Sequence, residues 1–221
     1  MISNFFTKRV QLAIKYALDK IISICGLILL SLPFLIIALL IKLDSKGSVF
    51  FRQERVGKDG RLFRTWKFRT MIEGAVNQGL GYNVSEDDPR ITRVGRFLRK
   101  WGIDELPQLI NVLKGEMSLV GPRPTLKYQV DHYNDFQRRR LLVKPGITGW
   151  ALIHGRNLLS WEERIKYDVW YVDNWSIWLD FWIILKTIWV VLIKREGVYG
   201  KGGINDDFIK FFPKKAEGEG E

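Results

Sequence analysis

Residues 21–41 form the feature that most limits how this chain can fold, because they are 21 consecutive residues without a charge, closed by Lys42. About 20 apolar residues suffice to cross the hydrocarbon core of a membrane as a helix. A cleaved signal peptide is not expected, because the run starts late, is too long and has no small-residue cleavage pattern after it. The sequence therefore predicts a membrane-embedded helix near the N-terminus.

This apolar run is interrupted near its midpoint by Ser31, Leu32 and Pro33. Proline removes a helical hydrogen bond and clashes with the preceding turn, so we expect a bend. The chain is basic on both sides of the run, and a straight spanning helix would place one basic side outside, against the usual bias. We therefore predict a re-entrant helix broken at Ser31 and Pro33, with an ordinary single-pass anchor as the alternative.

Composition indicates anionic partners. The formal net charge is +11 and the pI is about 9.8, which fits nucleic acid, anionic lipid or phosphorylated substrates. Six of the nine tryptophans fall between Trp161 and Trp189, which favours a membrane interface over nucleic acid. The single Cys25 allows no intrachain disulfide, and two histidines leave little for a zinc or haem site, so a metal should be a hard cation on carboxylates.

The segment after the apolar run reads as a basic β-hairpin. Two β-prone stretches, residues 48–55 and 62–69, flank a turn at Lys58-Asp59-Gly60. Their many arginines and lysines could simply be a solvated face. Residues 72–87 lack periodicity and are expected to form a loop.

Two consecutive helices are predicted next. The first has Asp88 as its N-cap and Pro89 at its first position, and Gly102 ends it. The second covers residues 105–113, with Asp104 as its N-cap and Gly115 at its end.

The rest of the chain is expected to be helical. Residues 126–142 resemble one charged helix, and Ser160 with Glu163 forms a capping box that opens another. Residues 176–194 predict an apolar, tryptophan-rich helix in the interface plane. Asp180 and Lys186 disfavour the alternative of a second spanning helix. The tail from residue 213 is expected to be disordered.

Asp104 and Glu105 are adjacent carboxylates at a predicted helix start. Such residues are common there without any function, since they stabilise the first turn. A helix N-terminus is also a natural phosphate site, and Arg99 lies one turn earlier. Two carboxylates can hold Mg2+ together with substrate oxygens, and a carboxylate can attack phosphorus. Phosphate chemistry is therefore a candidate function for this pair.

Five motifs occur along the chain in this order: KFRTM (67–71), DPRITRVGRFLRK (88–100), DELPQLINVLKGEMSLVGPRP (104–124), KPGITGW (144–150) and HGRN (154–157). Together they resemble the bacterial sugar transferase family, the monotopic polyprenyl-phosphate phosphoglycosyl transferases, in its minimal form. The resemblance covers residues 15–194, with the motifs in the family's order. One departure is Leu32, which separates the serine and proline that adjoin each other at the family's helix break.

The resemblance implies a two-step reaction. Asp104 would attack the β-phosphate of a UDP-sugar and release UMP, and polyprenol phosphate would then accept the phospho-sugar. Glu105 would hold Mg2+ with Asp104 and assist the acceptor. The family's remaining substrate- and phosphate-binding positions correspond to Lys67, Arg99, Arg123, Arg156 and Asp168.

Taken together, we expect an α+β fold that is mainly α, with a re-entrant membrane helix, a small β-hairpin and a helical catalytic core with interfacial helices. The expected divisions are residues 1–46 for the N-terminal amphipathic segment and membrane helix, 47–212 for the catalytic domain and 213–221 for the tail. The expected location is the bacterial cytoplasmic membrane, with the active site on its cytoplasmic face. The expected partners are a UDP-sugar donor, a polyprenol phosphate acceptor and membrane lipid, without nucleic acid. Two rival functions are a basic binding module and a glycosyltransferase that releases UDP. The oligomeric state, homo-oligomers included, is left open.

Overall fold

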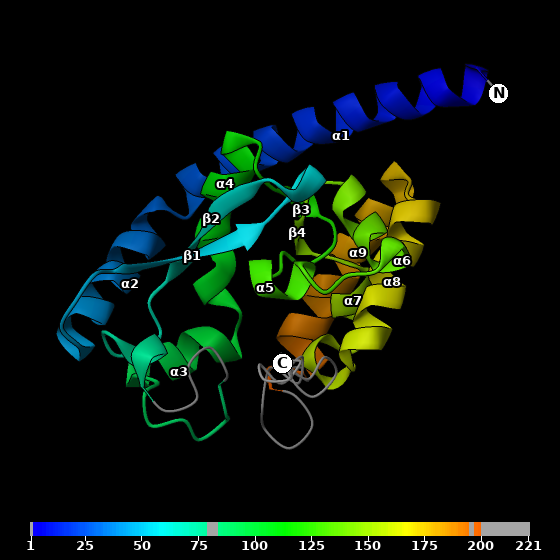
Figure 1. Ribbon diagram of the computed structural model, residues 1–221. Coiled ribbons are helices and arrows are strands. Elements are labelled where there is room, and N and C mark those ends of the chain that lie inside the picture. Colours follow the sequence, from blue (N-terminus) through cyan, green and yellow to red (C-terminus); the bar gives the residue numbers. More distant parts are fainter. Residues whose placement is uncertain (1, 79–83, 195–196, 200–221) are drawn as a thin grey trace, which may run out of the picture.

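The computed structural model describes residues 2–78, 84–194 and 197–199. In this part of the chain the fold is mainly helical, with one antiparallel strand pair and one short parallel pair. In Figure 1 the first helix runs across the top of the view, and the later helices gather at the right. The mainly helical expectation is confirmed.

The apolar run forms the end of α1 (Ile2–Leu29) and most of α2 (Ser31–Asp44). The Ser31 hydroxyl donates a hydrogen bond of 2.7 Å to the Ile28 carbonyl at the break. No single helix among the described residues is long and apolar enough to span a membrane. A pair of helical segments has the required length and apolarity when taken together: Lys8–Leu29 and Ser31–Asp44, with a bend of 61° between them. The predicted break is confirmed, and Ser31 supplies one backbone partner there despite Leu32.

A buried polar stripe docks α1 on the rest of the molecule. The Lys15 ammonium forms an ion pair of 2.5 Å with Asp180 and donates to the Val120 carbonyl at 3.0 Å. One turn later, the Asp19 carboxylate accepts a hydrogen bond of 2.6 Å from the Ser118 hydroxyl. The first helix thus packs against the folded core and also contains the first part of the apolar run.

The predicted hairpin is confirmed. Strands β1 (Phe50–Val56) and β2 (Leu62–Phe68) pair antiparallel, with Gln53 opposite Thr65. The connection contains a 3-10 turn, η1 (Lys58–Gly60). The following loop also contains a 3-10 turn, η2 (Ala75–Asn77), before residues 79–83, which lie outside the described part.

The predicted helix start at Asp88 and Pro89 is wrong. Helix α3 covers Arg93–Lys100, and the Thr92 hydroxyl caps it by accepting from the Gly95 N–H at 3.0 Å. The Asp88 carboxylate instead forms a buried ion pair of 2.6 Å with Arg90. An aspartate that binds a nearby arginine is not available as a helix cap, so the helix begins one turn later.

The next helix also differs from the prediction. The carboxylate pair lies in a 3-10 helix, η3 (Ile103–Gln108), and α4 (Leu109–Lys114) follows it. Asp104 is inside the first turn and is not the N-cap, which is Gly102 in the left-handed region at φ 66°. The predicted end at Gly115 is confirmed, with φ 80°.

A parallel strand pair, β3 (Ser118–Val120) and β4 (Gly146–Thr148), was not predicted. Two backbone bonds of 2.9 Å continue it, from the Gly121 N–H to the Thr148 carbonyl and from the Gly146 N–H to the Pro122 carbonyl. A methyl group on Gly146 would lie 2.1 Å from the Gly121 nitrogen. The glycines of the GPRP and KPGITGW motifs therefore let the two backbones touch.

The predicted helix over residues 126–142 is wrong, because three short helices occupy it. They are α5 (Lys127–Val130), α6 (Asp135–Arg138) and the 3-10 helix η4 (Arg139–Leu142). Asn134 starts α6 by accepting from the Gln137 N–H at 2.9 Å. A capping residue inside a charged run therefore divides it into separate helices.

The last helices follow the predicted order. After α7 (Trp150–Ile153) and the 3-10 turn η5 (Arg156–Leu158), the predicted capping box of Ser160 and Glu163 opens α8 (Trp161–Asn174). The apolar helix α9 (Ile177–Trp189) continues into a π-helical turn, η6 (Val190–Lys194).

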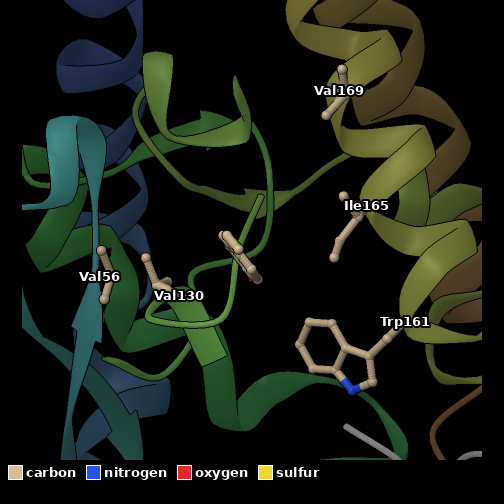
Figure 2. Packing of buried hydrophobic residues seen from close by; sticks show 6 residues of the cluster. Val56, Val130, Trp161, Ile165 and Val169 are labelled. Carbon is tan, nitrogen blue, oxygen red and sulfur yellow. The ribbon is translucent and has the colours of Figure 1, made fainter. Parts of the chain in front are cut away.

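One hydrophobic cluster joins the hairpin to the C-terminal helices (Figure 2). Val56 from β1 and Val130 from α5 belong to it together with Trp161, Ile165 and Val169 from one face of α8. Removing a side chain such as that of Ile165 would cost about 2–5 kcal/mol. The division at residue 46 stays a prediction, and the tail at 213–221 lies outside the described residues.

Candidate active site

A cavity of about 800 Å3 lies between the hairpin, α3, η3 and the C-terminal helices. Its wall contains all the predicted catalytic and substrate-binding side chains, although they come from six different parts of the sequence. These are Lys67, Arg99, Asp104, Glu105, Arg123, Arg156 and Asp168. Ser31 and Pro33 lie elsewhere, at the bend between α1 and α2.

Local geometry presents Asp104 and Glu105 to this cavity. Gly102 reverses the chain after α3 with a positive φ that other residues rarely adopt. Ile103 then packs beside buried Leu98, while Pro107 is buried at the other end of η3. Anchored at both ends, the intervening turn holds its two carboxylates at the cavity wall.

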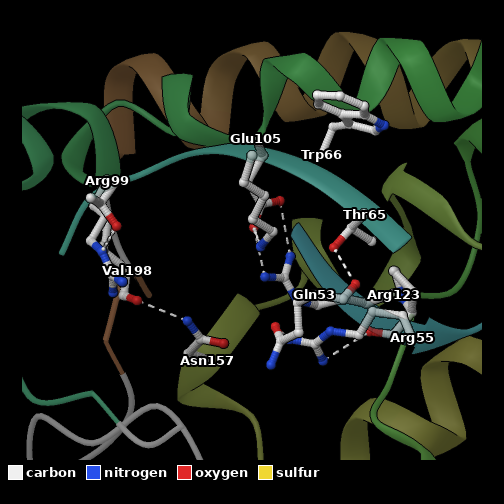
Figure 3. Close-up of polar contacts among 12 residues, drawn as sticks. Gln53, Arg55, Thr65, Trp66, Arg99, Glu105, Arg123, Asn157 and Val198 are labelled. Carbon is white, nitrogen blue, oxygen red and sulfur yellow. Dashed lines mark hydrogen bonds and ion pairs between the residues drawn. The ribbon is translucent and has the colours of Figure 1, made fainter. Parts of the chain in front are cut away.

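Glu105 is fixed by two cations. Its Oε1 lies 2.7 Å from the Lys67 ammonium, and the Arg123 guanidinium donates to Oε1 at 2.7 Å and to Oε2 at 3.1 Å (Figure 3). Burial disfavours the charged carboxylate, but Arg123 and Lys67 outweigh it and hold the pKa of Glu105 well below its usual range. Burial lowers the pKa of Lys67, and the charge of Glu105 partly offsets this.

Asp104 stands in the opposite environment. Its carboxylate accepts no hydrogen bond from the described residues, although it faces the same cavity. Burial and the neighbouring charge of Glu105 raise its pKa, while Lys67, Arg99 and Arg123 partly offset the rise. An unengaged carboxylate near several cations is suited to attack an anionic electrophile.

Two further cations of the cavity, Arg99 and Arg156, differ in how their side chains are held. The Arg99 Nε donates to the Thr70 hydroxyl at 2.8 Å, so α3 and the end of the hairpin hold it together. Arg156 has φ 51°, which a non-glycine residue rarely adopts, and its buried Nη1 has no hydrogen-bond partner among the described residues. Burial lowers the pKa of Arg156, offset in part by Glu105. Strain and an unsatisfied N–H together indicate a ligand-binding position.

Asn157, which follows Arg156, ties a later segment to the same turn. Its backbone N–H donates to the Gly197 carbonyl at 3.3 Å, and its side chain donates to the Val198 carbonyl at 2.8 Å (Figure 3). Val198 and Tyr199 also line the cavity. The HGRN motif therefore shapes the cavity as well as supplying a cation.

Asp168 lies on the cavity wall, but a protein partner already occupies its carboxylate. It forms a buried ion pair with Arg140. Burial raises the pKa of Asp168, and Arg140 works against this. Sequence reasoning missed Arg140, because it stands in a run of three arginines that nothing distinguishes from a solvated helix face.

The carboxylate pair fits a magnesium ion only with help from substrate. Among the described residues no group of three or more metal-binding side chains occurs. Within the described part of the chain, Asp104 has its oxygens available, and Glu105 Oε2 accepts a single hydrogen bond, which leaves a lone pair. Mg2+ commonly binds one or two carboxylates together with phosphate oxygens and water, so the donor set fits that mode.

Comparison with known proteins identifies relatives over most of the chain. The sequence profile of the bacterial sugar transferase family matches residues 10–194. The uncharacterized sugar transferase EpsL of Bacillus subtilis is 51% identical over 158 residues, which are 72% of this chain and 76% of the relative.

Two other relatives carry names that state a reaction. The UDP-N-acetylgalactosamine-undecaprenyl-phosphate N-acetylgalactosaminephosphotransferase of Aeromonas hydrophila is 44% identical over 185 residues, which are 81% of this chain and 44% of the relative. The UDP-glucose:undecaprenyl-phosphate glucose-1-phosphate transferase of Escherichia coli is 42% identical over 190 residues, 82% of this chain and 41% of the relative. The matched region is therefore less than half the length of these two proteins.

Proposed function

The chain belongs to the bacterial sugar transferase family, and on this basis we propose that it transfers a phospho-sugar from a UDP-sugar to polyprenol phosphate. The products would be UMP and a polyprenyl-diphospho-sugar. In this role the protein would start the assembly of a surface polysaccharide or glycoprotein glycan. Support comes from relatives whose names state such a donor and acceptor and from the cationic cavity around Asp104 and Glu105.

The cations of the cavity would bind the donor's diphosphate. Arg99 and Arg123 lie near the carboxylate pair, and Arg156 brings the buried N–H without a partner. A phosphate oxygen would satisfy that N–H through a charge-assisted hydrogen bond. Lys67 would neutralise charge near the phosphorus, since phosphoryl transfer depends mainly on positioning and charge stabilisation.

Asp104 would be the nucleophile. Its carboxylate oxygen attacks the β-phosphorus, the bond from that phosphorus to the bridging oxygen breaks, and UMP leaves with the bond's electrons. An acyl phosphate then joins Asp104 to the sugar phosphate. An oxygen of polyprenol phosphate attacks the same phosphorus, and the Asp104 carboxylate is regenerated as the leaving group.

Glu105 would support both steps while remaining charged. With Asp104 it would hold Mg2+, and the ion would neutralise charge that develops on the phosphate oxygens. Held by Lys67 and Arg123, Glu105 would also orient the incoming acceptor phosphate.

The lipid acceptor requires a site at a membrane. The bend between α1 and α2 exposes apolar side chains, with Leu29 78% and Leu32 65% exposed, and α9 exposes Trp178 and Trp189. These surfaces support a re-entrant helix and an interfacial helix in a bacterial cytoplasmic membrane, with the cavity on its cytoplasmic face.

The observation that carries the proposal is an unengaged Asp104 carboxylate beside a Glu105 fixed by two cations. It is tested by measuring nucleotide release from a panel of UDP-sugars, with polyprenol phosphate and Mg2+, for the wild type and Asp104→Asn. We expect UMP from one or a few donors and a loss of at least about 10³-fold in the variant.

Three other outcomes of this assay would contradict the proposal. UDP would identify a glycosyltransferase that passes the sugar without its phosphate. Release unaffected by Asp104→Asn would remove this residue as the phosphorus nucleophile. A basic binding module would release no nucleotide from any donor and would bind anionic vesicles equally well with or without Asp104.

A further inference from the structure

A buried cation lies beneath the loop that carries Arg123. Arg140, in the 3-10 helix η4, has only 3% of its side chain exposed. Its Nη1 donates to the Tyr133 hydroxyl at 2.6 Å, and its Nη2 donates to the Arg123 carbonyl at 2.9 Å and to the Asp168 carboxylate. One guanidinium therefore joins helix α8 to two loops, the one that carries Arg123 and the one between α5 and α6.

Arg140 and Asp168 stabilise each other's buried charge. The Asp168 side chain is also 3% exposed, so each ion lacks water to stabilise it and relies on its partner. Tyr133 extends the network, because its hydroxyl donates to the Thr125 hydroxyl at 3.3 Å. Lysine could keep the charge of Arg140 but could not reach all three acceptors with one planar group.

The position of Arg123 depends on its backbone. Its side chain is 51% exposed, so packing alone does not fix it. The loop is held at Pro122 by the Gly146 N–H, at Thr125 by the Val56 N–H, and at Arg123 itself by Arg140. The guanidinium that grips Glu105 thus starts from a backbone point that Arg140 holds.

We propose that Arg140 is a positioning residue, with Asp168 as its counter-ion, that aims the Arg123 guanidinium at Glu105 and at the donor's diphosphate. Asp168 then acts through Arg140 and Arg123, not through contact with substrate. This role rests on the proposed phospho-sugar transfer, because Arg123 and Glu105 are the groups being aimed.

The kinetic test is a double-mutant cycle on the UMP-forming step. In the wild-type background, we expect Arg140→Lys and Asp168→Asn each to lower kcat/KM for the UDP-sugar by about 10- to 100-fold, because the misplaced Arg123 guanidinium contacts both Glu105 and the donor's diphosphate. In an Arg123→Ala background, each should cost no more than about twofold further, because the group being aimed is gone.

A matched control separates positioning from folding. Arg90 and Asp88 form another buried ion pair. Arg90→Lys should therefore lower activity by the same factor in the wild-type and the Arg123→Ala backgrounds, because it changes only the amount of folded protein. Equal losses from Arg140→Lys in both backgrounds, or a donor KM that rises in Asp168→Asn even without Arg123, would overturn the proposal.

A second readout needs no catalysis. With 15N-labelled arginine, the Nε–H signal of Arg123, assigned by its disappearance in Arg123→Lys, should shift or broaden in Arg140→Lys and stay unchanged in Arg90→Lys. An unchanged Arg123 signal in Arg140→Lys would refute the positioning role. A wild-type protein that releases no UMP from any donor would instead refute the proposed function and leave this measurement valid.

Discussion

At the scale of single residues, two neighbouring carboxylates have opposite electrostatic environments. Two cations hold Glu105 in its charged form, whereas burial and Glu105 itself make ionisation of Asp104 harder. A nucleophilic carboxylate must be ionised, so activity is present above the pKa of Asp104 and is lost as the pH falls through it.

This arrangement predicts how Glu105→Gln changes the pH profile. The substitution removes a negative charge beside Asp104 and leaves Lys67 and Arg123 free to stabilise its carboxylate. The pKa of Asp104 should fall, so the acid limb of the UMP-forming rate should move to lower pH, whatever happens to the maximal rate. Single-turnover rates between pH 4 and 7, given as approximate limits set by ordinary carboxyl pKa values, would measure it.

The control for this prediction is Asp131→Asn, which removes an exposed carboxylate paired with Lys127. It should leave the acid limb in place. A limb that stays fixed in Glu105→Gln, or moves to higher pH, would show that Asp104 does not carry the titration.

The strained backbone of Arg156 predicts that replacing this residue by glycine raises stability and lowers activity. Glycine tolerates φ 51°, so Arg156→Gly should relieve about 1 kcal/mol of strain and raise the melting temperature by about 2–4 °C. The same change removes a proposed diphosphate contact and should lower kcat/KM for the donor roughly 10- to 100-fold.

Arg156→Ala is the matched variant, because it removes the guanidinium and keeps the strain. It should lose the same activity without the gain in melting temperature. Equal melting temperatures for the glycine and alanine variants would contradict the strain argument, and full activity in both would remove Arg156 from the donor site.

At the scale of elements, the parallel pair β3 and β4 fixes the loop that carries Arg123. Its backbones approach so closely at Gly121 and Gly146 that no side chain fits between them. Gly146→Ala should therefore push the loop away, cost about 1–3 kcal/mol and lower the melting temperature by roughly 2–12 °C.

Activity should fall together with stability in this variant. Gly57→Ala is the control, because its methyl group would meet the ring of Phe63 at 3.2 Å, which can move, and the Arg61 carbonyl at 3.4 Å, which is ordinary van der Waals contact. A Gly146→Ala protein as stable and active as the control would show that the close approach is unimportant.

Elements with local signals were predictable and those without were not. The hairpin turn, the Ser160 cap and the Gly115 terminus are encoded by residues within four positions of one another, and all three predictions are confirmed. The parallel pair joins Ser118 to Gly146 across the sequence and has three residues per strand, too few for a periodic pattern. Asp88 gave a false signal, because its partner, Arg90, is equally local and binds it more strongly than a helix end does.

The site was predictable for a different reason. Apart from Asp168, its predicted cations and carboxylates lie in motifs that resemble one family, and the structure brings all of them to one cavity. Arg140 and Tyr133 lie outside these motifs, and only the three-dimensional structure shows what they contact.

At the scale of the whole molecule, α1 has the reverse of a soluble helix's distribution. Lys15, Asp19 and Ser23 are buried against the protein, while Ile14 and Leu18 are exposed. The sequence indicated helical spacing but not which face would be buried. An outward apolar face suits a helix that contacts lipid on the way to the bend.

The bend predicts the topology of the chain. With Cys25 replaced by serine, single cysteines at Lys20 and Lys46, both exposed, should react with an impermeant reagent from the same, cytoplasmic side of membrane vesicles. Cysteine at exposed Arg61 in the hairpin marks the side of the membrane on which the proposed catalytic domain lies. Labelling of the two positions from opposite sides would show a spanning helix.

The stripe of Lys15, Asp19 and Ser23 has a consequence for engineering this protein. A foreign membrane anchor of the right length would restore lipid attachment but would remove the Lys15 ammonium that pairs with buried Asp180 and the Asp19 carboxylate that accepts from Ser118. Chimaeras should therefore work only when the donor helix reproduces this polar pattern at every fourth position. The N-terminal helix therefore cannot be replaced by an arbitrary membrane anchor, and mutant libraries of this helix should keep Lys15, Asp19 and Ser23 constant.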